Sequence, residues 1–182
     1  MGKILKRKTP TTVFQSIMAA DYETIWLYLD AEYNALNRIA ARLPLPMMLE
    51  QRATTRGGQG NIGEAINVSL NALWSRREAV EDVVWQKLSD LYMELPRAEK
   101  VDVGKKAKEW RNLGTTTTYL SDEALEQIDQ IAIYMRNRGH VVPRMLRGGT
   151  GSPRVISAIA ILFTSRFLIP ALKQEQALRN FR

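Results

Sequence analysis

The sequence predicts a mainly α-helical protein with a short two-stranded antiparallel β-ribbon, and three observations lead to that fold class. Apolar residues recur at helical spacing along most of the chain. Two short stretches, TTVFQS at 11–16 and TTTTYL at 115–120, are rich in residues that favour strands. Each stretch is followed by a helical pattern, a Gly-rich turn and another helical pattern. The chain therefore consists of two halves of similar order.

The second half begins with the clearest strand, residues 115–120. Ser121 then predicts a helix N-cap, because its hydroxyl can accept a hydrogen bond from a free amide of the first turn. Apolar residues at helical spacing continue this helix to Arg138, and Gly139 can adopt the left-handed conformation that ends a helix. Both ends of the helix are thus predicted from local residues.

A second helix of this half begins at Ser152 and Pro153, a typical N-cap and first-turn pair. Residues 155–163 are apolar nearly all round, which indicates a buried helix. The end of the chain, FLIPALKQEQALRNFR, is also predicted to be helical, with a kink at Pro170.

In the first half, TTVFQS is placed as the strand, although TIWLYLD at 24–30 is also rich in strand formers and offers a competing register. From Ile17 to Leu43 the apolar positions step by three or four, which predicts a long amphipathic helix ended by the prolines of LPLP. Another helix is expected from Ile62 to Leu91.

A repeated motif links the two halves. RGGQGN at 56–61 recurs as RGGTGS at 147–152, and a Pro-x-Met-Leu sequence precedes each copy. Such a repeat indicates an internal duplication. One half cannot stand alone, since its strand needs a partner and its apolar helix needs another helix to pack against.

The stretches TTTTYLSDEALEQI and GSPRVISAIAILF resemble the ribbon-helix-helix family of DNA-binding proteins, the superfamily of Arc, MetJ and CopG. With both halves in one chain, the arrangement is similar to the single-chain proteins of conjugative DNA transfer, of the TraY and VirC types. The resemblance implies a tandem ribbon-helix-helix pseudo-dimer that is a monomer or weak oligomer. It also implies binding to double-stranded DNA, as an accessory factor of the relaxosome or a regulator of a mobile element. Other relaxosome or nucleoprotein subunits are the further partners it implies.

The predicted organisation has four segments. They are a basic arm at 1–10, a first half at 11–95, a basic linker at 96–113 and a second half at 114–182, with the two halves forming one compact domain. A chain of 182 residues is long enough for one sizeable domain.

The net charge of +7 is unevenly distributed. Residues 1–16 hold four basic side chains and no acid, residues 97–111 hold six basic side chains against three acids, and residues 136–154 hold five arginines and no acid. Each segment alone is an ordinary solvated loop or arm. Together they favour a polyanionic partner such as nucleic acid.

Alternate side chains of a strand face opposite sides, so one set of ribbon residues is expected to face the bases of a major groove. The base-facing residues are predicted to be Thr115, Thr117, Tyr119, Thr12 and Phe14. Phosphate contacts are expected from the arm and from both Gly-rich turns, whose amides begin helices. These residues are Lys6, Arg7, Lys8, Arg56, Gly60, Asn61, Arg147, Gly151, Ser152 and Arg154. The simpler alternative is that the glycines turn the chain and that Asn61 and Ser152 only cap helices.

The composition argues against an enzyme. There is no cysteine, and the one histidine, His140, is expected to be an exposed loop residue, so no metal site or cofactor is predicted. GGTGSPR lacks the lysine of a P-loop. No apolar run approaches the ~18 residues of a membrane span, and no signal peptide is evident, so a cytoplasmic protein without a membrane partner is expected.

A second function remains open, namely a small helical subunit that lines nucleic acid in an RNA-guided effector or another nucleoprotein complex. The threonine tract distinguishes the two functions. A tract that is paired with a second strand and exposed favours the DNA-binding protein, whereas absorption into a helix or burial against helices favours the subunit.

Overall fold

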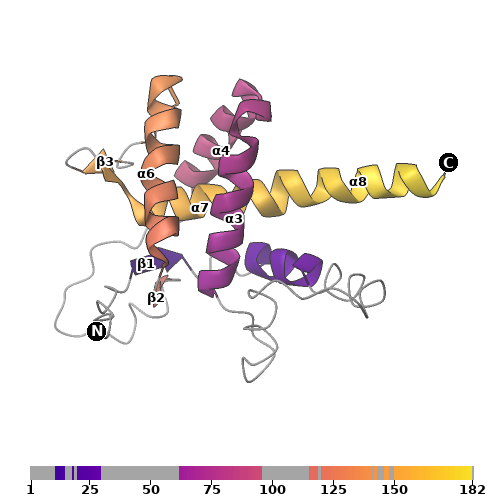
Figure 1. Ribbon diagram of the computed structural model, residues 1–182, viewed down its shortest axis with the longest axis horizontal. Helices are drawn as coiled ribbons and strands as arrows, with labels where there is room; N and C mark the ends of the chain where they lie inside the picture. Colours follow the sequence, from indigo (N-terminus) through magenta and orange to yellow (C-terminus); the bar gives the residue numbers. More distant parts are fainter. Residues whose placement is uncertain are drawn as a thin grey trace, which may run out of the picture.

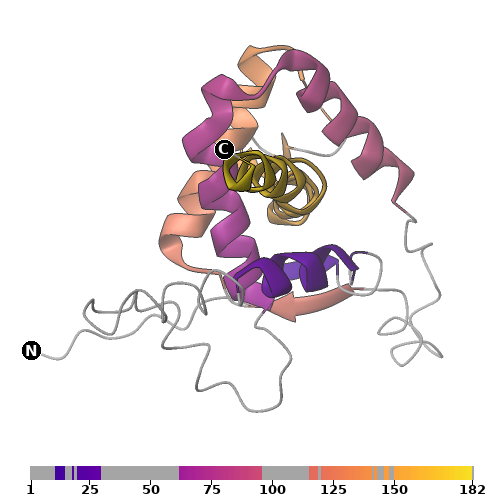
Figure 2. The same cartoon turned by 90° about the vertical axis from the view of Figure 1, so that its right-hand side faces the viewer.

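The computed structural model describes residues 11–14, 18, 20–29, 62–95, 115–118, 120–140, 142, 146–147 and 150–181. A helical rod runs through the molecule, composed of α7 (Pro153–Phe163), the π-helical turn η2 (Thr164–Leu168) and α8 (Ile169–Asn180). Viewed along the rod, the other helices form a collar around it (Figure 2). The collar consists of α3 (Ile62–Arg76), α4 (Asp82–Glu94), α6 (Asp122–Asn137) and the helix at 20–29.

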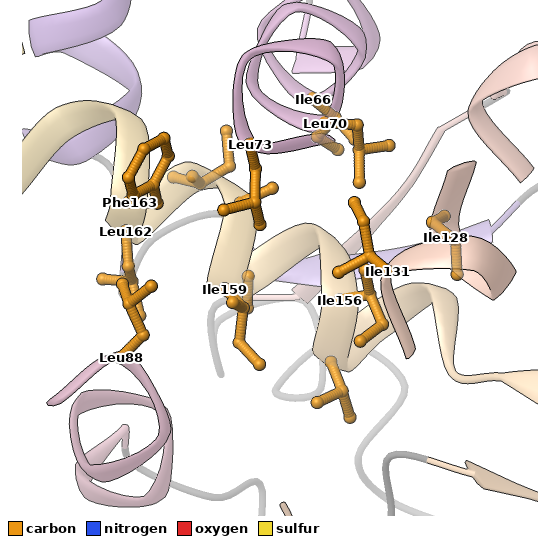
Figure 3. Packing of buried hydrophobic residues seen from close by; sticks show 14 of the residues in the cluster. Ile66, Leu70, Leu73, Leu88, Ile128, Ile131, Ile156, Ile159, Leu162 and Phe163 are labelled. Carbon is orange, nitrogen blue, oxygen red and sulfur yellow. The ribbon is translucent and has the colours of Figure 1, made fainter. Parts of the chain in front are cut away.

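The core is centred on α7, in which every residue from Val155 to Phe163 is buried. Figure 3 shows Ile156 and Ile159 between residues of α3 and α6, and Leu162 beside Leu88 of α4. Burial of a large aliphatic side chain contributes about 1.5–3 kcal/mol to folding. A helix that is apolar on all sides requires neighbours on all sides, and the collar supplies them.

Local signals at both ends of α6 are confirmed. Ser121 is the N-cap, and its side-chain oxygen accepts a hydrogen bond from the amide of Ala124 at 3.1 Å. At the other end Gly139 has a φ of +78°, its amide donates to the carbonyl of Arg136, and the amide of His140 donates to that of Met135. This pair of bonds is a Schellman motif, the helix ending for which glycine is best suited.

The expected helix from Ile62 to Leu91 is instead two helices. α3 ends at Arg76, a short turn η1 (Arg77–Ala79) follows, and Val80 is extended with a ψ of 116° before α4 begins. No proline or glycine marks the break. The bend lets α3 and α4 both pack against α7 from different sides, which one straight helix could not do (Figure 2). Tertiary packing therefore overrides the local helical pattern.

The competing register for the first strand is excluded, because residues 24–29 of TIWLYLD lie in the helix at 20–29. The remainder of the predicted helix, residues 30–43, lies outside the described residues. Met18, Tyr22 and Ile25 are buried at helical spacing, as the pattern predicts.

Four short strands are present in the described chain. β1 (Thr11–Phe14) pairs antiparallel with β2 (Thr115–Thr118), and β3 (Leu146–Arg147) pairs antiparallel with β4 (Thr150–Gly151). We call β1 and β2 the strand pair. It lies beside α7, near the start of α6 (Figure 1).

The predicted fold class, a mainly α-helical tandem ribbon-helix-helix pseudo-dimer with a short two-stranded antiparallel β-ribbon, is corrected to an almost wholly helical fold. Every buried hydrophobic residue whose side chain the structure describes lies in a helix or near the end of one. The halves are also unequal, since the second supplies the central rod and the first supplies part of the collar (Figure 2).

The rod also differs from the sequence prediction near Pro170. In place of a simple kink, the helix widens at η2, where the amide of Ile169 donates to the carbonyl of Thr164, and Pro170 lies in the first turn of α8. Proline has no amide hydrogen to donate, and a wide turn just before it accommodates the missing bond.

The sequence predicts no apolar run long enough to span a membrane, but the helical run Pro153–Asn180 is long and apolar enough to do so by length and composition, and its most apolar window has a mean hydropathy of 2.0. However, 67% of its apolar window is buried inside the protein, which is typical of a core helix.

Candidate nucleic-acid interface

The register of the strand pair brings together four of the predicted base-facing residues. Thr12 lies opposite Thr117, and Phe14 lies opposite Thr115. Directly opposed residues of an antiparallel pair share a face, and so do residues two apart on one strand. Thr12, Phe14, Thr115 and Thr117 therefore all belong to one face, which we call the even-odd face. Thr11, Val13, Thr116 and Thr118 belong to the other. Tyr119, the fifth predicted residue, lies outside the described residues.

The two basic segments join the strand pair at opposite ends. Residues 1–10, with four basic side chains and no acid, lead directly into Thr11. Residues 97–114, with six basic side chains and three acids, lead directly into Thr115. Because the strands are antiparallel, Thr11 pairs with Thr118 at one end and Thr115 pairs with Phe14 at the other, about 10 Å away. Positive charge is thus attached at both ends of the pair by chain connectivity alone.

The second Gly-rich turn is built differently from the predicted phosphate site. The amide of Gly151, expected to meet a phosphate, donates to the carboxylate of Asp129 in α6 at 2.6 Å. A Cβ on Gly151 would lie 2.9 Å from the carbonyl oxygen of Ile128. Gly151 is therefore required by close packing against α6, and its amide is already paired with a negative charge.

The neighbours of Gly151 are placed as follows. Ser152 is the N-cap residue of α7, and its carbonyl accepts from the amide of Ile156, but its side chain makes no capping bond. Arg154 lies in the first turn of α7 and is half-buried. The backbone of Arg147 lies in β3. At Gly151 the structure thus supports the simpler alternative, in which the glycine turns the chain and binds no phosphate. The roles of Arg147, Ser152 and Arg154 stay predictions.

The other predicted phosphate contacts remain predictions. Lys6, Arg7, Lys8, Arg56, Gly60 and Asn61 lie outside the described residues. The start of α6 next to the strand pair is not an anion site, since Ser121 caps it and Asp122 and Glu123 occupy its first turn.

One polar cluster, at the end of α6 far from the strand pair, was missed by the sequence analysis (Figure 1). His140, expected to be exposed, has a side chain only 12% exposed. Its Nε2 lies 3.1 Å from Oδ1 of Asp82, which also accepts from Arg138 at 3.2 Å, and its ring stacks on Trp85. Hydrogen bonds from His140 and then from Arg138 lower the pKa of Asp82. The cluster joins the end of α6 to the start of α4. No local signal predicts it, because the residues from α6 and those from α4 are more than 50 positions apart in the sequence.

A second missed cluster fixes the helix at 20–29 to the rod. The carboxylate of Asp21 accepts from Nε of Arg166 at 2.9 Å, from Nη2 of Arg166 at 3.0 Å and from the hydroxyl of Ser165. The Asp21 side chain is 9% exposed, and the hydrogen bond to it raises the pKa of Arg166. The residues that bind Asp21 lie within η2, so this network holds the widened turn against the helix that follows β1.

Among the described residues, no three His, Asp or Glu side chains are grouped so that they could hold a metal ion.

No family model, curated protein or solved structure matches this chain.

Proposed function

We propose that this protein binds double-stranded DNA and presents the even-odd face of the strand pair to the major groove. The observation that carries the proposal is the register of β1 and β2, which gathers Thr12, Phe14, Thr115 and Thr117 on one face. A two-stranded antiparallel pair fits the width of the major groove. Threonine hydroxyls can donate to or accept from base edges there.

The basic segments support the same proposal. They join the strand pair at its two ends, so a duplex that receives the strands in its groove would have phosphates near both segments. Contacts of this kind position a protein on DNA and make its binding strongly dependent on salt. Sequence preference would then come from the strand pair and general affinity from the segments.

The physiological role in the proposal is that of an accessory factor of conjugative transfer or a regulator of a mobile element, which the sequence resemblance implies. Other subunits of a relaxosome or nucleoprotein complex are the additional partners. α8 is a candidate to contact them, since it projects beyond the collar (Figure 1). Leu178 of α8 is 61% exposed, and Phe181, directly after the helix, is 90% exposed.

The projection of α8 also favours the second function, a helical subunit of a nucleoprotein particle, because a free helix is a common docking element in assemblies. In favour of DNA binding, the threonine tract pairs with a second strand and is not absorbed into a helix. The exposure of its side chains lies outside what the structure describes. The DNA-binding proposal is therefore preferred.

A gel-shift series at two ionic strengths tests the choice, with duplex DNA, single-stranded DNA and RNA of equal length. The proposal expects the duplex to bind most tightly and the affinity to fall steeply with salt. Equal or tighter binding to RNA or to single strands would support the subunit and contradict the proposal.

Variants of the strand pair test which face reads DNA. Thr117→Ala with Tyr119→Ala should abolish preference among duplexes while salt-sensitive binding remains. Thr116→Ala, on the opposite face, is the matched control and should leave the preference intact. Loss of preference in the control alone would mean that the even-odd face is not the one that reads DNA.

A further inference from the structure

We infer that the even-odd face selects thymine-containing, A·T-rich sites by contact with the C5-methyl groups of thymine. This inference rests on the proposed function, and it names the class of duplex that the strand pair prefers. The observation behind it is the set of residues that the register gathers on that face.

None of the four residues carries the groups used to read guanine. Guanine is recognised in the major groove chiefly by arginine or lysine, whose donors bond O6 and N7, and adenine by asparagine or glutamine. Thr12, Phe14, Thr115 and Thr117 have no such side chains, and neither do the four residues of the opposite face. β1 and β2 thus lack the bidentate arginine or lysine donors that read guanine, whichever of their faces meets the groove.

The same four residues are suited to thymine. Each threonine side chain contains a γ-methyl group and that of Phe14 an aromatic ring, and groups of this kind can contact the thymine methyl. The threonine hydroxyls can donate to thymine O4 or accept from the adenine N6 amine of the same base pair. A face of three threonines and one phenylalanine therefore combines groups that can contact thymine methyls with hydroxyls that can bond the base edges.

The test compares duplexes of equal length that differ only in the C5-methyl group. One pair contains A·T or A·U base pairs, and the other contains G·C or G·5-methylcytosine base pairs. Each contacted methyl should change affinity roughly fourfold. We expect the A·T duplex to bind more than tenfold tighter than the A·U duplex, and methylated cytosine to bind tighter than cytosine.

Thr→Ser variants assign the effect to the face, because serine keeps the hydroxyl and loses the methyl. Thr12→Ser with Thr117→Ser should reduce discrimination between the A·T and A·U duplexes while duplex binding persists. Thr11→Ser with Thr116→Ser, on the opposite face, should leave it unchanged.

The failures are distinguishable. Duplex binding with equal affinity for the A·T and A·U duplexes would overturn this inference and leave the proposed function intact. Discrimination that survives in the Thr12→Ser, Thr117→Ser variant would overturn the assignment to this face. Absence of duplex binding would overturn the proposed function and this inference with it.

Discussion

Asp21 gives the sharpest prediction about the fold. Its carboxylate is the common acceptor for Ser165 and Arg166, and its side chain is 9% exposed. Asp21→Ala would leave the Ser165 hydroxyl buried without this partner and the Arg166 guanidinium without its carboxylate. Both losses fall at η2, where the rod is widened. We expect the helix at 20–29 to detach more easily from the rod.

The magnitude follows from burial. Removal of one partner of a fully buried ion pair costs about 3–5 kcal/mol. The Arg166 side chain is 42% exposed. Water can therefore solvate Arg166 once Asp21 is gone, and we discount the cost to about 2–3 kcal/mol. With a urea m-value of about 2 kcal/mol/M, the midpoint of unfolding should fall by about 1–1.5 M.

Urea unfolding followed by circular dichroism measures this change. The matched control is Glu23→Ala, an exposed acid on the same helix, which should change stability by no more than about 0.5 kcal/mol. A double-mutant cycle with Arg166→Ala should give a coupling energy in the range of about 0.5–3 kcal/mol. Equal midpoints for the Asp21 and Glu23 variants would refute the reasoning.

Three other predictions concern packing, pH and salt. Gly151→Ala should lower the free energy of unfolding by about 1–3 kcal/mol, because the alanine Cβ would lie 2.9 Å from the Ile128 carbonyl oxygen. An unchanged midpoint of thermal unfolding would show that the turn can move aside. Burial, and then the charge of Asp21, raises the pKa of Tyr22. The folded protein therefore favours the neutral form of Tyr22. The stability that this contributes is fully present below about pH 10, the pKa of tyrosine in the unfolded chain, and is lost as the pH rises above that value. Tyr22→Phe should make alkaline unfolding less steep than in the wild type, and parallel curves would contradict this. Replacement of Lys6, Arg7 and Lys8 by glutamine should weaken binding to all duplexes alike. It should also reduce the slope of log affinity against log salt concentration by up to about 2.7. A loss of binding confined to one DNA sequence would argue against phosphate contacts.

Local chemistry made parts of this structure predictable. Ser121 and Gly139 mark the two ends of α6 through hydrogen bonds that involve only nearby residues. The composition of residues 155–163 identified the buried helix. The strand-forming residues of 11–14 and 115–118 were likewise evident from the sequence, and their register is that of an antiparallel pair.

Features that depend on distant residues were not predictable from local patterns. Val80 breaks a continuous helical pattern because α3 and α4 pack on different sides of α7. Gly151 was assigned to phosphate because nothing in its motif reveals Asp129 or the Ile128 carbonyl. The pseudo-dimer was inferred from repeated motifs. Such motifs do not reveal that the second half supplies the rod and that the first half supplies part of the collar.

Site-specific photocrosslinking tests the central claim most directly. A benzophenone side chain is placed at position 117 or at position 116, on opposite faces of the strand pair, and each protein is irradiated with duplex DNA. We predict a DNA adduct from position 117 and little or none from position 116. An adduct from position 116 alone, or from neither position while the duplex is bound, would contradict the claim that the even-odd face meets the major groove.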